Sequence, residues 1–109
     1  MAFDETLANR VRSLLAGTEG VVEKKMFGGL AFLAQGNMSV GVHGSELIVR
    51  VDPAETEPAL KEPGVRVFDI TGRPMKGWLL VSASSLSEKK ALAHWVNRGV
   101  SYARSLPAK

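Results

Sequence analysis

The sequence has no cysteine, only two histidines and no long apolar run. Without cysteine the chain can form neither a disulfide nor a thiolate metal site, and it has no cysteine nucleophile. No stretch approaches the roughly 20 apolar residues that a membrane-spanning helix requires. The first ten residues, MAFDETLANR, start acidic and lack the apolar core of a signal peptide. We therefore expect a cytoplasmic protein that makes no contact with a membrane.

The length and the charge set further limits. At 109 residues the chain is expected to be one domain, residues 1–109, long enough to bury a core without covalent staples. The formal net charge is +3, and the longest basic runs are the pairs Lys24–Lys25 and Lys89–Lys90. Nucleic-acid-binding domains usually concentrate positive charge along one face or one helix. The charge therefore permits an anionic partner and does not by itself indicate one.

Apolar spacing predicts a helix near the N-terminus. Its buried face consists of Leu7, Val11, Leu14 and Leu15, which follow one another at helical spacing. Asp4 is expected to cap the start of this helix. Gly17 is expected to end it, because glycine readily adopts the left-handed conformation that follows many helices.

Residues 21–51 change to the short alternating patterns of β-strands. The four segments are VVEKKMF, GGLAFLAQ, NMSVGV and ELIVRV. Gly36–Asn37 suits a two-residue hairpin loop, since a glycine in the first position accepts a positive φ angle. Residues 43–45, HGS, suit a three-residue connection. Links this short require antiparallel neighbours, so we expect a meander.

The second half of the chain predicts a short helix, two strands and a long helix. Asp52 is the expected N-cap of the short helix, which Pro58 limits to one or two turns. The strands VRVFDI and GWLLVSA follow, joined by TGRPMKGW at residues 71–78. Ser85 and Glu88 are expected to form a capping box for the long helix. The buried face of that helix consists of Leu92, Trp95, Val96, Gly99, Ala103 and Leu106.

This order of elements predicts an α+β protein. A helix is followed by four strands, a short helix, two strands and the long helix. Because helices and strands do not alternate one for one, a parallel sheet built from βαβ units is disfavoured. We expect two layers, an antiparallel β-sheet with the helices packed on one face.

Catalytic signatures are missing from the sequence. His43 falls in a predicted hairpin loop, and His94, beside Trp95, is interpreted as a partly buried structural residue. No Gly-x-Ser-x-Gly elbow is present, and no histidine pair has the helical spacing of a zinc site. We therefore expect no enzyme activity, no catalytic residue, no cofactor and no bound metal.

Two glycine-containing segments allow either a structural or a binding role. Gly28–Gly29 precedes an apolar strand and not a helix, so a bulge or strand corner is favoured over a phosphate loop. In residues 71–78 the glycines and the proline are typical of a turn. A turn does not explain why Arg73 and Lys76 bracket Met75. A solvated turn is the first interpretation of this segment, and a recognition surface is the second.

Four segments together resemble the TfoX N-terminal domain family: KKMFGGLAFLAQGNMSVGV, LIVRVDP, FDITGRPMKGWLLV and WVNRGVSYARSLPAK. Members known as TfoX or Sxy regulate DNA-uptake competence in bacteria, as coactivators beside a cyclic-AMP receptor transcription factor. The resemblance implies a two-layer α+β fold similar to secretion-chaperone-like domains. The full regulators carry a second, helical domain, whereas this chain stops at Lys109. We therefore expect a stand-alone, single-domain member.

The resemblance implies an interaction module that contacts a protein partner, such as a transcription factor, in transcription regulation. It transfers no catalytic residue. The candidate recognition surface consists of Lys24, Lys25, Arg50, Arg73, Met75 and Lys76. Basic groups around a flexible methionine suit an acidic, partly apolar protein surface. Direct, weakly specific nucleic-acid binding is the alternative, and a small-molecule ligand or self-association stays open.

Overall fold

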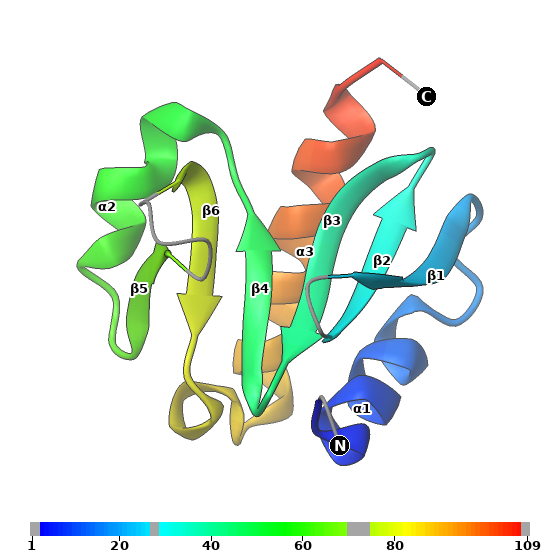
Figure 1. Ribbon diagram of the computed structural model, residues 1–109, viewed down its shortest axis with the longest axis horizontal. Coiled ribbons are helices and arrows are strands. Elements are labelled where there is room, and N and C mark those ends of the chain that lie inside the picture. Colours follow the sequence, from blue (N-terminus) through cyan, green and yellow to red (C-terminus); the bar gives the residue numbers. More distant parts are fainter. Residues whose placement is uncertain (1–2, 27–28, 70–74, 108–109) are drawn as a thin grey trace.

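An antiparallel sheet lies at the centre of the protein, and two helices cover one of its faces (Figure 1). The computed structural model describes residues 3–26, 29–69 and 75–107. Within these ranges the elements are α1 (Glu5–Leu15), β1 (Val21–Met26), β2 (Gly29–Ala34), β3 (Asn37–His43), β4 (Glu46–Arg50), η1 (Pro53–Glu55), α2 (Thr56–Leu60), β5 (Val65–Phe68), β6 (Met75–Val81), η2 (Ala83–Leu86) and α3 (Lys89–Ser105). The predicted α+β class and its order of helices and strands are confirmed.

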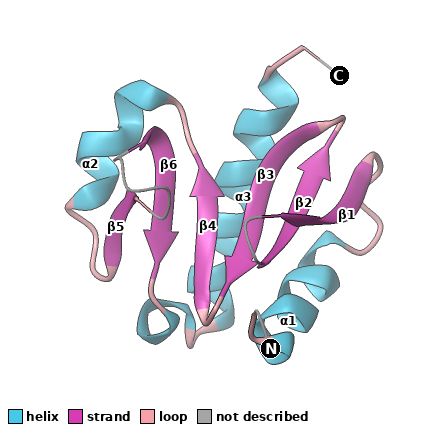
Figure 2. Cartoon of the chain, in the orientation of Figure 1, coloured by secondary structure: helices cyan, strands magenta, loops and turns pink. Residues whose placement is uncertain are grey.

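The six described strands follow the spatial order β1-β2-β3-β4-β6-β5, and every neighbouring pair is antiparallel (Figure 2). The predicted meander over the first four strands is confirmed. The last two strands join in reversed order, so that β6 pairs with β4 while β5 forms an edge. This order places the end of β4 beside β6, where Arg50 is opposite Trp78.

The turn between β2 and β3 differs from the prediction. Gln35 and Gly36 form it, and the expected Gly36–Asn37 loop is wrong by one residue. Both turn residues have positive φ angles, 53° and 85°, as a type I′ turn requires. Asn37 instead begins β3, where it pairs with Ala34. Its buried side chain donates a hydrogen bond of 2.9 Å to the carbonyl oxygen of Pro107.

The turn between β3 and β4 is shorter than predicted. His43 pairs with Glu46, which leaves Gly44 and Ser45 as a two-residue loop in place of the expected three residues. Gly44 has a φ angle of 57°, a conformation that glycine adopts without steric cost. His43 is therefore the last residue of a strand and not part of a loop.

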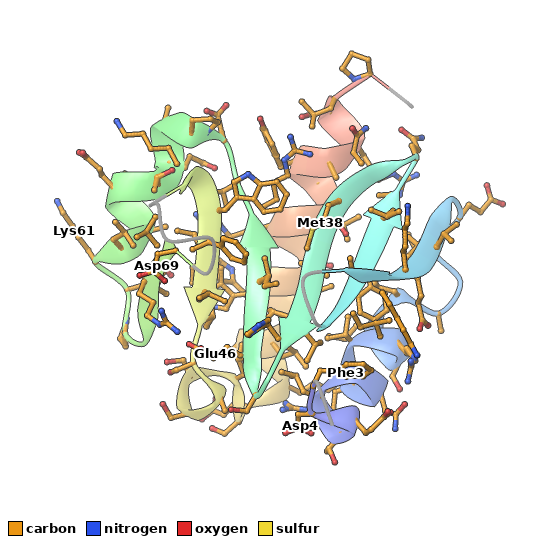
Figure 3. All side chains as sticks on the ribbon, viewed as in Figure 1. Phe3, Asp4, Met38, Glu46, Lys61 and Asp69 are labelled. Atoms are coloured by element: carbon orange, nitrogen blue, oxygen red, sulfur yellow. The ribbon has the colours of Figure 1, made fainter. Side chains whose placement is uncertain are left out.

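Helix α1 begins and ends as its sequence predicts. Asp4 lies at its start (Figure 3), and its carboxylate accepts hydrogen bonds from the backbone amides of Thr6 and Leu7 at 2.8 and 3.1 Å. Gly17 follows the helix with a φ angle of 84°, which confirms its left-handed role.

The short helical segment after β4 is confirmed as well. The Asp52 carboxylate caps η1 by accepting a hydrogen bond of 2.9 Å from the Ala54 amide. Helix α2 follows directly and runs for only five residues, with Pro58 inside its first turn. A proline is tolerated there because the first amides of a helix have no intrahelical partner.

The start of helix α3 contradicts the predicted capping box. Ser85 belongs to η2, and its hydroxyl donates to the carbonyl oxygen of Pro63 at 2.8 Å, so it does not cap the helix. The helix begins at Lys89 with Glu88 as its N-cap residue, and the Glu88 side chain makes no capping hydrogen bond. The serine hydroxyl is used instead to hold the loop before β5 against η2.

Two apolar clusters lie on opposite faces of the sheet. The larger cluster lies between the sheet and the helices α1 and α3. The smaller cluster lies on the opposite face of the sheet, here called the outer face, and consists of Ala31, Met38, Ile48, Phe68 and Leu80. Neighbouring strand residues such as Ile48 and Val49 belong to different clusters because their side chains point to opposite faces.

Helix α3 packs closely on β3. Its predicted buried face is confirmed for Leu92, Trp95, Val96, Gly99 and Ala103, whereas Leu106 lies just past the helix and is half-buried. A Cβ atom added at Gly99 would overlap the carbonyl oxygen of Ser39 and lie 2.6 Å from Val40 Cγ1. The missing side chain therefore permits this approach of helix and strand.

Candidate recognition surface

The two lysines of β1 lie on an edge strand and point to opposite faces of the sheet. Both side chains are exposed. Lys24 is opposite Ala31, which belongs to the smaller cluster, so Lys24 shares the outer face. Lys25 is opposite Leu30, which belongs to the larger cluster, so Lys25 is on the side of the two long helices. A partner that lies flat on the outer face therefore meets Lys24 and not Lys25.

Arg50 ends β4 and is held between two aromatic rings. The carbon of its guanidinium group lies 4.9 Å from the centroid of the Trp78 ring and 5.7 Å from the centroid of the Tyr102 ring. Trp78 comes from the adjacent strand β6, and Tyr102 comes from the last turn of α3. Each contact is a cation–π interaction. We call these three residues the arginine stack.

Three other arginines of the described residues pair with carboxylates. The pairs are Arg12 with Glu23, Arg66 with Glu46 and Arg98 with Glu62, with shortest distances of 2.9, 2.6 and 2.9 Å. The hydrogen bond to Glu23 raises the pKa of Arg12, and the hydrogen bond to Glu46 raises the pKa of Arg66. Arg50 forms no hydrogen bond or ion pair with the described residues, so no carboxylate of this part of the chain pairs with it.

The start of β6 is fixed by a buried threonine. The Gly77 amide donates to Thr56 Oγ1 at 2.7 Å, and its carbonyl oxygen accepts from the Val51 amide at 2.8 Å. Gly77 has a φ angle of 86°, which only glycine adopts readily. These bonds connect α2, β4 and β6 next to Trp78, and they set where the arginine stack forms.

Replacing Thr56 with valine should lower the free energy of unfolding by about 1–2 kcal/mol, because the buried Gly77 amide would lose its partner. Thr56→Ser keeps a hydroxyl and should cost clearly less. Urea denaturation of both variants measures the difference. An equal loss in the two variants would contradict the role given to this hydrogen bond.

The segment 71–78 is described only in part. Lys76 lies on β6 and is exposed, and Met75 is the first residue of the same strand. Arg73 lies outside the described residues, as does Gly28 of the predicted strand corner. Arg50 and Lys76 therefore belong to neighbouring strands, while Lys24 lies several strands away on β1. Whether the six candidate residues bind a partner stays a prediction.

An open groove of about 660 Å³ lies beside the arginine stack, between η1 and α3. It is lined by Tyr102 of the stack and by the exposed carboxylate residues Asp52 and Glu55. His94 lines it too, with a side chain that is 55% exposed, 3.9 Å from a Glu62 oxygen. The interpretation of His94 as a partly buried residue is therefore wrong.

The described residues contain neither a metal-ligand cluster nor a membrane-spanning helix. Across residues 3–26, 29–69 and 75–107, no three histidine, aspartate or glutamate side chains gather where they could hold a metal ion. None of the described helices combines the length and the apolar character needed to cross a membrane.

Sequence reasoning included Arg50 but missed the two rings that hold it. Trp78 is the last residue of the segment 71–78, and Tyr102 lies in the last helix. Local patterns do not show that β6 pairs with β4, so they could not bring these residues together. An aromatic residue at the start of a strand was the only available signal.

Comparison with protein-family models gives a match. A family model described as the TfoX N-terminal domain matches residues 13–103 of the 109-residue chain. No curated protein and no solved structure matches it. The matched range includes all three residues of the arginine stack.

Proposed function

Because the chain belongs to the TfoX N-terminal domain family, we propose that it acts as a non-enzymatic, competence-regulator-like module that contacts a protein partner in transcription regulation. We place this activity in the bacterial cytoplasm. The partner we propose is a transcription factor of the cyclic-AMP receptor class.

The arginine stack is the observation that carries this proposal. Arg50 is a half-buried cation that two aromatic rings hold in place without neutralising it. Arginine, tryptophan and tyrosine are the residue types that most often dominate the binding energy of protein–protein interfaces. An ordered and uncompensated charge of this kind supports contact with an oppositely charged group of another molecule.

The proposed contact surface extends from the arginine stack along β6. Lys76 lies two residues before Trp78 on that strand and adds an exposed charge. Lys24 adds a further charge on the outer face at the far edge of the sheet. Charges at the rim of an interface mainly raise the association rate, whereas a buried anchor mainly sets the dissociation rate.

Reversing the charges at Arg50 and Lys76 together, as the Arg50→Glu, Lys76→Glu variant, should weaken binding to the purified transcription factor by about tenfold or more. The matched control reverses two lysines remote from the stack, Lys61 at the end of α2 (Figure 3) and Lys90 at the start of α3. Biolayer interferometry on the factor, alone and on promoter DNA, measures the affinity. A thermal melt confirms that both variants are folded.

Three results would overturn the proposal. If the domain does not bind the factor, the proposed partner is wrong. If the control variant weakens binding as much as the Arg50→Glu, Lys76→Glu variant does, the proposed surface is wrong. Binding to the promoter DNA alone, with an affinity that falls steeply as salt rises, would favour the nucleic-acid alternative, because neutralised phosphates release their counterions.

A further inference from the structure

We propose that the arginine stack is a binding site for a single carboxylate group, supplied by an aspartate or glutamate side chain of the partner protein. This inference rests on the proposed function, since it names the chemistry by which the same surface recognises its partner. It goes further in assigning Arg50 as the anchor and Trp78 and Tyr102 as the groups that hold it.

The guanidinium group of Arg50 is prepared for such a ligand. Trp78 and Tyr102 contact it through their rings, so its N–H groups keep their capacity to donate hydrogen bonds. Arginine presents these donors in a planar fork that matches the two oxygens of a carboxylate. Because the rings already restrict the side chain, binding costs less conformational entropy than it would for a free arginine.

The comparison with Arg66 shows what Arg50 lacks. Arg66 lies on the edge strand β5 and donates to both carboxylate oxygens of Glu46, at 2.6 and 3.2 Å. Arg98 also stacks on a ring, with its guanidinium carbon 4.6 Å from the centroid of Trp95, and it donates to Glu62 as well. Arg98 therefore combines a ring and a carboxylate within the chain. Arg50 has the rings, and the partner would supply the carboxylate.

The surroundings favour a protein carboxylate over nucleic acid. Tyr102 also lines the groove that contains the exposed carboxylate residues Asp52 and Glu55. A nucleic acid strand carries a row of phosphates, and some of them would lie close to these two negative charges. A single side-chain carboxylate reaches Arg50 without placing further negative charge in the groove. The rings of Trp78 and Tyr102 add the apolar area typical of protein interfaces.

Nuclear magnetic resonance titration of the intact domain tests the site. The probe is the blocked peptide acetyl-Ala-Glu-Ala-amide, and the matched control is the same peptide with glutamine in place of glutamate. We expect saturable shifts of the Arg50 Nε–H and Trp78 Nε1–H signals with the glutamate peptide, with a Kd on the order of 10 mM, as for one charge-assisted hydrogen-bonded pair. The glutamine peptide should bind at least several-fold more weakly.

Three variants distinguish the contributions of the planar guanidinium fork and of the aromatic rings to the affinity from the contribution of the positive charge alone. Arg50→Lys keeps the charge but not the planar fork, and it should lose most of the affinity. Tyr102→Leu removes one ring and should weaken binding several-fold, whereas Tyr102→Phe keeps the ring and should leave it unchanged. Equal binding by wild type and Arg50→Lys, or shifts that spread over all exposed cations, would overturn the proposal.

A short duplex DNA serves as the competing probe. If it shifts the Arg50 and Trp78 signals at lower concentration than the glutamate peptide, the site takes phosphate and the inference is wrong. If the domain binds the transcription factor while the glutamate peptide leaves both signals in place, this inference fails and the proposed function stands. If the peptide binds and the factor does not, the carboxylate site is supported and the proposed partner is wrong.

Discussion

Replacing Trp95 with alanine should lower the free energy of unfolding by about 3–5 kcal/mol, the range found when a large buried aromatic side chain is removed. Trp95 is only 4% exposed, because it belongs to the cluster between α3 and the sheet. The substitution leaves a cavity that close-packed neighbours can fill only in part. It also removes the ring on which the Arg98 guanidinium group lies.

Urea denaturation followed by circular dichroism measures this loss, and the dependence of the free energy on urea concentration should change little. Trp78→Ala is the matched control, because Trp78 is half-buried and packs only at the margin of the smaller cluster. That control should cost clearly less. An unchanged midpoint in Trp95→Ala would mean that α3 does not pack on the sheet through this residue.

Replacing Gly99 with valine should cost about 3 kcal/mol, at the upper end of the usual effect of overpacking. The new Cβ atom alone would overlap the Ser39 carbonyl oxygen, which belongs to the backbone of β3 and cannot turn aside. Either α3 or β3 must then move, and Trp95 and Val96 would lose part of their packing against the sheet.

The control for Gly99→Val is Ser101→Val, two residues further along the same helix on its exposed side. It introduces the same side chain where nothing is displaced, so only the difference in helix propensity, a few tenths of a kcal/mol, should appear. Thermal melts of the two variants give the comparison. If Gly99→Val has the same melting temperature as Ser101→Val, the close packing of α3 on β3 is not required for stability.

Much of the fold could be predicted because the order of nearby residues in the sequence indicates where its helices and strands begin and end. The cap at Asp4, the left-handed Gly17 and the buried face of the last helix depend only on residues close in sequence. Some of the errors occurred where a group has a distant partner. Ser85 resembles a helix cap, but its hydroxyl is used by Pro63, which lies 22 residues away in the chain.

The same distinction explains the candidate surface. The sequence itself shows that Arg50 is a cation on a predicted strand. Its two rings come from β6 and α3. Trp78 meets Arg50 because the sheet order places β6 next to β4, and Tyr102 meets it because α3 packs against β4. Lys24 and Lys25 illustrate the reverse case, since adjacency in the sequence suggests one patch whereas strand alternation separates them. Pairing order and register are properties of the whole chain.

Helix α3 is the last described element along the chain, and it covers the middle of the sheet. Because a chain is synthesised from its N-terminus, every strand has left the ribosome before residues 89–105 can pack against it. Until then the side chains of Leu47, Val49 and Leu79 face solvent. We therefore expect a period during synthesis in which this part of the larger apolar cluster is available to chaperones or to neighbouring chains.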